Sequence, residues 1–295
     1  MIAVFSAWWA VGLLVADVAT SPHPRKIAPR QRLFGRPVES VEVCARDGVV
    51  ARGWLLEADV QLPSTSAAKR CVILAAGIRG DRRAMQSRAP FYLDRGWSTL
   101  LVDLRGTGES EPTRIAMGYH EALDLLAFAR DLRGRGFVQI GLHGQSLGAA
   151  AAVYTAVRAG ASGAAGASSQ TPLAWRFVVL EACYRDIRAA LSARMLGLPG
   201  FLLYPIVASA EWLLSVDADA LDPVSAIAAL DAPLFVACGD RDSKVGSGAS
   251  EALLAASPAR DKVRHDVVGA GHVDLWAARG GNALRSALAD FLSRR

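Results

Sequence analysis

The stretch GLHGQSLGAA, residues 141–150, follows the apolar run FVQI and places one serine between two glycines. The apolar run predicts a buried strand, and the small residues after Gly148 predict a closely packed helix. Glycines on both sides of Ser146 allow the sharp, strained turn that exposes a serine hydroxyl at the end of a strand. Ser146 is therefore a candidate nucleophile, and the alternative is a serine that only caps the helix.

The rest of the chain repeats the alternation of strand and helix. Its apolar runs are short and do not alternate with polar residues, which is typical of parallel strands covered on both faces. These runs cover residues 71–76, 98–103, 137–142, 177–182, 233–239 and 263–268. Helical spacing of apolar residues appears between them, at residues 118–133, 146–158, 247–256 and 282–293.

An antiparallel hairpin is predicted ahead of these strands. VEVCA at 41–45 and VVARGWLLEA at 49–58 flank an Asp47-Gly48 pair, which favours a tight turn. The sequence therefore predicts an α/β fold, a mostly parallel doubly wound sheet opened by an antiparallel hairpin, with helices on both faces.

Two stretches do not follow the alternation of strand and helix. Residues 160–170, GASGAAGASSQ, predict a mobile surface loop. Residues 184–230 form a much longer insertion before the strand at 233–239, and they contain the apolar segment MLGLPGFLLYPIVASAEWLL. We expect a short helical cap that forms the wall of an apolar pocket, and the alternative is an ordinary pair of buried helices.

The N-terminus differs from the main domain, which we place at residues 41–295. Residues 1–20 are strongly apolar, and residues 21–40 form a basic linker with Arg25, Lys26 and Arg30. The apolar segment predicts membrane association through an N-terminal anchor. Two alternatives are a cleaved export signal and a helix docked on the domain of a cytoplasmic protein.

Composition excludes several classes of protein. The 33 basic and 28 acidic residues give a formal charge of +5, but the arginines are scattered, which argues against a nucleic-acid partner. The four cysteines lie far apart, so we expect ordinary buried thiols at Cys44, Cys71, Cys183 and Cys238. Because neither HExxH nor clustered ligand spacing occurs, no metal or other cofactor is expected.

A serine hydroxyl needs a base, and His272 is the strongest candidate. Of the five histidines, only His272 lies in a loop of small residues, GAGHVD, between the last strand and the last helix. The others occupy the tail, a helix start, the position before the turn and a strand, and they are His23, His120, His143 and His265.

The histidine in turn needs a carboxylate to orient it. Asp240 and Asp242 both follow the strand at 233–239, and Glu181 ends the preceding strand. Spacing alone does not choose among these three.

The order of Ser146, the acid and His272 resembles the α/β-hydrolase family over residues 41–292. In that family the acid commonly follows a glycine by three positions, which implies Asp242 after Gly239. A finer resemblance, to serine aminopeptidase-like hydrolases, depends on DLRGTGES at 103–110 and on Asp222-Pro223-Val224.

The developing oxyanion also needs donors. The turn geometry gives the backbone N–H of Leu147 as one donor. The resemblance implies a second donor after the strand at 71–76, which falls on the N–H of Ile78; relatives often carry His-Gly where this chain has Ala76-Gly77. We expect the charged residues beside it, Arg79, Asp81 and Arg82, to fix this loop rather than to bind an anionic substrate.

These features predict a serine hydrolase with the triad Ser146, Asp242 and His272, acting through an acyl-enzyme on a small-molecule ester with an apolar acyl group. A peptidase or amidase would use the same triad, so amide substrates are the first alternative. The second is a non-catalytic binding protein on the same fold.

Overall fold

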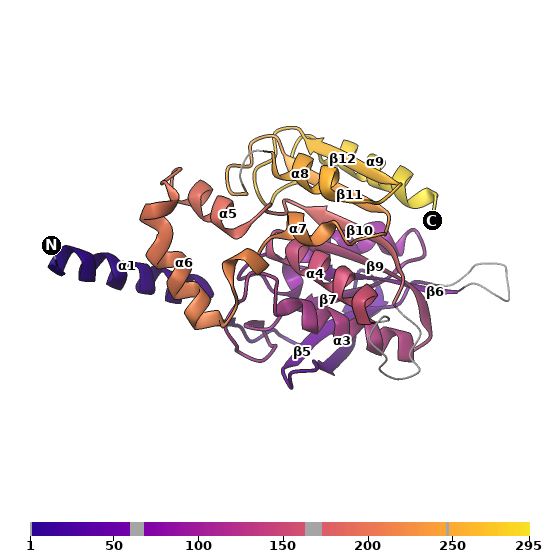
Figure 1. Cartoon of the computed structure of the whole chain (residues 1–295). Helices are drawn as coiled ribbons and strands as arrows, with labels where there is room; N and C mark the ends of the chain where they lie inside the picture. Colours follow the sequence, from indigo (N-terminus) through magenta and orange to yellow (C-terminus); the bar gives the residue numbers. More distant parts are fainter. Residues whose placement is uncertain (1, 60–67, 163–172, 246–247) are drawn as a thin grey trace.

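The computed structural model describes residues 2–59, 68–162, 173–245 and 248–295 (Figure 1). The loop predicted at 160–170 therefore lies largely outside the described residues. The described chain forms one large sheet covered by helices on both faces, with a group of helices at one end (Figure 1).

The main sheet has eight strands in the order β12-β11-β10-β9-β6-β7-β5-β4. Their bounds are β4 (Glu39–Cys44), β5 (Val50–Leu56), β6 (Lys69–Ala75), β7 (Ser98–Asp103), β9 (Phe137–Gln145), β10 (Trp175–Glu181), β11 (Leu234–Gly239) and β12 (Lys262–Val267). The strands β6, β7 and β9–β12 pair in parallel, whereas β5 pairs antiparallel with β4 and β7. The predicted fold class, with its opening hairpin, is confirmed.

Two cores lie on opposite faces of this sheet, because side chains alternate along each strand. In β6, Cys71 and Ile73 join one core while Val72 and Leu74 join the other. The first core is covered by α3 (Glu121–Gly134), α4 (Leu147–Ser162), α7 (Pro223–Ile227) and α8 (Ala249–Ala256). The second is covered by the 3-10 helix η1 (Arg82–Arg88), α2 (Ala89–Leu93) and α9 (Gly281–Ser293).

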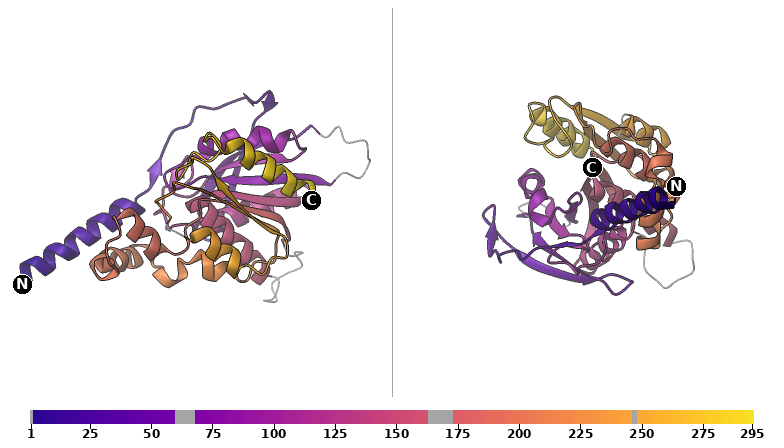
Figure 2. Two further views of the ribbon diagram at one scale, coloured as in Figure 1. Left: turned by 90° about the horizontal axis from the view of Figure 1, so that it is seen from above. Right: turned by 90° about the vertical axis from the view of Figure 1, so that its left-hand side faces the viewer.

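The insertion between β10 and β11 is helical. It contains α5 (Ile187–Arg194), α6 (Gly200–Leu214), the 3-10 helix η2 (Ala218–Ala220) and α7. The N-terminal helix α1 (Ile2–Thr20) packs along α6 and extends away from the body of the molecule (Figure 2). Among the described residues, no helix has both the length and the apolarity needed to cross a membrane.

The segment predicted as a basic linker contains three short strands. β1 (His23–Pro24) pairs in parallel with β8 (Thr107–Gly108), and β2 (Arg32–Leu33) forms a small hairpin with β3 (Arg36–Pro37). This segment therefore runs from the end of α1 across the domain to β4.

One prediction about the cysteines was wrong. Cys71 and Cys183 are buried, but Cys44 is exposed and Cys238 is only half-buried. The alternation of β4 explains the difference, because Val41 and Val43 face the core and Cys44 therefore faces solvent.

Candidate active site

Ser146 occupies a strained turn between β9 and α4. Its φ of 53° lies in the left-handed region, which disfavours residues with a side chain. The flanking glycines are required by close backbone contacts. A Cβ on Gly144 would lie 2.1 Å from the Gly148 oxygen, and one on Gly148 would lie 2.3 Å from the Ala75 oxygen. The sequence thus folds into the predicted strand, turn and helix, and the turn fixes the direction of the hydroxyl.

The structure brings three of the predicted residues into one hydrogen-bonded chain. His272 lies in the loop between β12 and α9, and its Nε2 is 2.9 Å from Ser146 Oγ. The other ring nitrogen, Nδ1, is 2.9 Å from Oδ2 of Asp242, which follows β11. The Asp242 side chain is fully buried, and 14% of the His272 side chain is exposed.

The two other candidate carboxylates, those of Asp240 and Glu181, bind other groups than His272. Asp240 Oδ1 accepts a hydrogen bond from the Gly269 N–H at 2.8 Å, so this side chain holds the turn after β12. Glu181 hydrogen-bonds to a different histidine, His143. Geometry therefore places only Asp242, of the three candidates, against His272.

Two hydrogen bonds keep Asp242 ionised. Burial raises its pKa, but the hydrogen bonds from His272 and from the Lys244 N–H outweigh this, so the pKa lies below its ordinary value. A carboxylate that stays charged can accept from Nδ1 of His272 and stabilise a positive charge on the imidazole.

A second cluster, which the sequence did not reveal, surrounds the Glu181 carboxylate. It accepts hydrogen bonds from Arg88 Nη2 at 2.6 Å, from His143 Nε2 at 2.8 Å and from Trp276 Nε1. Burial raises the Glu181 pKa, but the charge of Arg88 and its contact with His143 more than offset this, so the pKa lies well below its ordinary value. We call these four residues the Glu181 cluster.

The Glu181 cluster also supports the turn that carries Ser146. The Ser146 N–H donates to the Glu181 backbone oxygen at 2.8 Å. The Gln145 amide donates both to Glu181 Oε2 at 3.3 Å and to the Val273 oxygen, beside His272, at 3.2 Å. The cluster thus links the serine turn to the histidine loop. Its members are far apart in sequence. The only signal in the sequence was the position of Glu181 at the end of an apolar strand.

The two predicted oxyanion donors are Leu147, which follows Ser146, and Ile78, which follows a residue packed against Ser146. Leu147 is the first residue of α4, so its N–H has no acceptor within the helix. Ile78 belongs to the loop after β6, and this loop approaches the serine closely. A Cβ on the adjacent Gly77 would lie 3.2 Å from the Ser146 Cβ.

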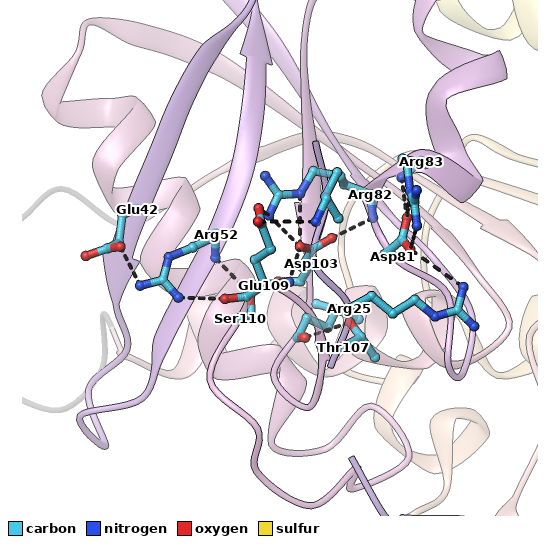
Figure 3. Close-up of polar contacts among 12 residues, drawn as sticks. Arg25, Glu42, Arg52, Asp81, Arg82, Arg83, Asp103, Thr107, Glu109 and Ser110 are labelled. Carbon is cyan, nitrogen blue, oxygen red and sulfur yellow. Dashed lines mark hydrogen bonds and ion pairs between the residues drawn. The ribbon is translucent and has the colours of Figure 1, made fainter. Parts of the chain in front are cut away.

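Ion pairs hold the loop after β6 in place (Figure 3). Asp103, at the end of β7, accepts from the Arg82 N–H at 2.6 Å and from Arg82 Nε at 2.9 Å. Asp81 accepts from Arg83 Nη2 at 2.7 Å, and Figure 3 shows Arg25 reaching the same carboxylate. Asp81 and Arg82 thus fix the loop, as interpreted from the sequence, whereas Arg79 donates to the Val18 oxygen of α1.

An apolar pocket of about 60 Å³ lies between α1, the cap helices and the loop before α3. Met117, Leu191, Ile206 and Leu214 are among the residues that line it. The Met117 loop also meets the start of α4, since a Cβ on Gly118 would lie 3.0 Å from the Leu147 oxygen. The pocket is therefore adjacent to the helix that begins at the serine turn.

A buried glutamate shapes the same loop. Glu121 accepts hydrogen bonds from the Ala116 N–H at 2.7 Å and the Gly118 N–H at 2.8 Å. Burial raises the pKa of Glu121 to about 7. No cluster of His, Cys, Asp or Glu among the described residues is arranged to hold a metal ion.

Comparison with known proteins identifies the family. The model of the "Alpha/beta hydrolase family" matches residues 72–280, which is well over half of the chain. The chain therefore belongs to the α/β-hydrolase family. Its expected place in the serine aminopeptidase-like branch stays a prediction. No curated protein matches the sequence.

Solved structures share the fold at low sequence identity. The Pyrococcus furiosus esterase Pf2001 is 20% identical, with a TM-score of 0.67 over 93% of this chain and 98% of that one. Est1E from Butyrivibrio proteoclasticus, solved with ferulic acid bound, is 16% identical, with a TM-score of 0.62 over 86% of this chain and 98% of that one. Dipeptidyl peptidase 4 from Porphyromonas gingivalis is 15% identical, with a TM-score of 0.62 over 88% of this chain and 36% of that one.

Proposed function

We propose that this hydrolase cleaves carboxylic esters of small apolar acyl groups through an acyl-enzyme on Ser146. The single observation that carries the proposal is the continuous chain from Asp242 Oδ2 through His272 to Ser146 Oγ, with both distances at 2.9 Å. A serine held at positive φ with a histidine nitrogen on its hydroxyl has the geometry of an activated nucleophile.

The proposed reaction has two steps. Ser146 Oγ attacks the ester carbonyl while His272 Nε2 takes the hydroxyl proton, and Asp242 stabilises the imidazolium. The N–H groups of Leu147 and Ile78 hold the oxyanion. The tetrahedral intermediate expels the alcohol, which receives the proton from His272. Water then attacks the acyl-serine with His272 as base, which releases the acid and restores Ser146.

The pocket beside Met117 supports an apolar acyl group. Its volume of about 60 Å³ compares with the roughly 10–15 Å³ that one water needs by the same measure, so it has room for a few non-hydrogen atoms. The esterases among the structural neighbours point to the same bond type. We therefore propose short acyl esters as the favoured substrates, with peptides and amides as the alternative.

Active-site labelling tests the nucleophile. A fluorophosphonate probe is expected to modify Ser146, located by peptide mass spectrometry, and Ser146→Ala is expected to lower kcat by at least about 10⁴-fold. Ser293→Ala, which changes a serine in the last turn of α9, is the matched control and should retain activity. Unchanged hydrolysis in Ser146→Ala, with no labelling, would support a non-catalytic binding protein.

A substrate panel tests the bond and the acyl group. We expect p-nitrophenyl butyrate to be cleaved faster than the palmitate ester, and both faster than aminoacyl anilides. Efficient cleavage of anilides with negligible cleavage of esters would favour the peptidase alternative. A maximum at long acyl chains would show that the pocket beside Met117 does not set the preference.

A further inference from the structure

Exposed apolar side chains are concentrated on α1, on α6 and on the loop before α6. Of the sixteen large apolar side chains exposed among the described residues, twelve lie there. Leu196 is 98% exposed, Val4 75%, Trp212 74% and Phe201 69%. Exposed apolar patches of this kind are uncommon on soluble monomers and mark surfaces that bind a partner or a membrane. We call the exposed apolar residues of α1 and of 196–212 the apolar arm.

The apolar arm is one surface because α1 and α6 pack side by side. Trp8 Nε1 donates to the Leu202 oxygen at 3.2 Å, and the rings of Trp9 and Tyr204 meet edge to face at 5.8 Å. A Cβ on Gly12 would lie 2.4 Å from the Pro205 Cβ, so the two helices approach closely. The pair extends from the body, with the N-terminal end of α1 farthest out (Figure 2).

The charges within the apolar arm and in the segment that follows α1 indicate what covers the arm. Residues 1–16 and 195–210 contain no charged side chain. Asp17 and Glu211, the acidic residues of α1 and α6, already bond within the protein, to Arg114 and to the Ala218 N–H, so the arm offers little charge to a protein partner. The segment that leaves α1, residues 18–38, contains five basic residues and no acidic residue. Arg25, Lys26, Arg30 and Arg32 are all exposed. An uncharged, apolar projection followed by basic residues complements a bilayer with anionic headgroups.

The aromatic residues of the arm fit the same surface. Trp8, Trp9, Tyr204 and Trp212 lie on the paired helices, and Trp and Tyr are the residues that favour the boundary between hydrocarbon and headgroups. We propose that the apolar arm, formed jointly by α1 and α6, inserts into the interfacial region of an anionic phospholipid bilayer.

Docking of the arm would orient the active site toward the lipid. The C-terminal end of α1 is bonded to the loop after β6, because Arg79 Nη2 donates to the Val18 oxygen at 2.7 Å. Arg114 pairs with Asp17 at 2.8 Å, and the Ile115 N–H donates to the Thr20 oxygen at 2.8 Å. The arm is therefore attached to the loops that carry Ile78 and Met117, so that lipid contact places the pocket beside Met117 near the membrane surface.

Vesicle flotation with the full chain tests the proposal. The wild type is expected to float with vesicles of phosphatidylcholine and phosphatidylglycerol, and less with phosphatidylcholine alone. The double variants Phe201→Ser/Trp212→Ser on α6 and Val11→Ser/Leu14→Ser on α1 should each lower the bound fraction by about tenfold or more. Val138→Ser/Val268→Ser, which alters side chains exposed by 49% and 46% outside the arm and the basic segment, is the matched control and should float like the wild type.

Three outcomes would overturn the proposal. The first is no flotation of the wild type. The second is full flotation of the α6 variant while the α1 variant fails, which would make α1 a tether by itself. The third is a wild-type dimer in sedimentation equilibrium that both arm variants abolish, because a second copy would then cover the arm. Thermal unfolding by circular dichroism checks folding of each variant. Loss of ester hydrolysis with normal flotation would instead contradict the proposed function alone.

Discussion

Two histidine–carboxylate pairs occur among the residues that the structure describes, and they differ in the group that contacts the second ring nitrogen. In the first, His272 contacts Asp242 at 2.9 Å and Ser146 Oγ at 2.9 Å. In the second, His143 contacts Glu181 at 2.8 Å and the Tyr92 hydroxyl at 2.9 Å. The pairs use the same chemistry at nearly equal distances, yet one contacts a serine hydroxyl in a strained turn and the other contacts a buried tyrosine hydroxyl.

Burial separates the roles of the two pairs. The His272 side chain is partly exposed, so a substrate can reach the bond it makes with Ser146. His143 and Glu181 are each 1% exposed, and both ring nitrogens of His143 have protein partners. A fully satisfied buried pair holds structure together, whereas a pair whose partly exposed histidine contacts a serine hydroxyl can move a proton.

The largest expected effect is on turnover. Asp242→Asn should lower kcat by about 10⁴-fold, because an amide cannot both accept from Nδ1 of His272 and stabilise the imidazolium. Asp240→Asn is the matched control two residues away, and it should change kcat by less than about threefold. Steady-state hydrolysis of p-nitrophenyl butyrate measures both. Equal losses in the two variants would mean that Asp242 is not the orienting acid.

The second-largest expected effect is a loss of stability on substitution of Glu181. Glu181→Gln should lower the free energy of unfolding by roughly 3–5 kcal/mol, because it leaves the buried Arg88 charge without its partner. Urea denaturation followed by tryptophan fluorescence measures the loss, and Glu251→Gln, at an exposed glutamate, is the control. The double variant Arg88→Met/Glu181→Gln should recover part of the lost stability. An unaltered unfolding midpoint in Glu181→Gln would contradict a structural role.

The buried ion pair of Glu181 with Arg88 also predicts that the free energy of unfolding depends on pH. The Glu181 pKa is lowered in the fold from an ordinary value of 4.5, so its contribution is complete above that value and is lost as the pH falls below it. The difference in unfolding free energy between wild type and Glu181→Gln should therefore be constant from pH 7 to 6 and shrink toward pH 3. Urea titrations at each pH measure it, and a gap that stays constant to pH 3 would exclude this linkage.

The smallest effect expected is that of Tyr92→Phe. Removal of the hydroxyl leaves Nδ1 of His143 without its partner and should lower the free energy of unfolding by about 1 kcal/mol. We expect kcat to stay within about twofold of the wild type, since the Tyr92 hydroxyl bonds to His143 rather than to Ser146, Asp242 or His272. A large loss of kcat at unchanged stability would mean that the two histidine–carboxylate pairs do not divide the roles in this way.

Local patterns were enough to predict the strands and the serine turn. The runs at 71–76 and 98–103 became β6 and β7 because continuous apolar residues have to be covered on both faces. The turn at Ser146 was predictable because glycine is the residue that tolerates the backbone contacts at 144 and 148. His272 was predictable because only this histidine lies in a loop of small residues between a strand and a helix.

Other features were not predictable because they depend on contacts between distant segments. Spacing left Asp240, Asp242 and Glu181 open, and only the fold of the loops after β11 and β12 separates them. The Glu181 cluster joins η1, β9, β10 and the segment before α9, and no short pattern marks such a set.

The sequence by itself determined the α/β alternation, the nucleophile turn and the loop histidine, because each depends on neighbours within a few residues. It also showed that residues 1–20 and the segment at 195–210 are apolar. Only the tertiary structure placed these two segments side by side as α1 and α6, and only it brought Asp242 to His272. The physical reason is that periodicity records which side of an element is apolar, whereas the element that covers that side is chosen by packing across the whole chain.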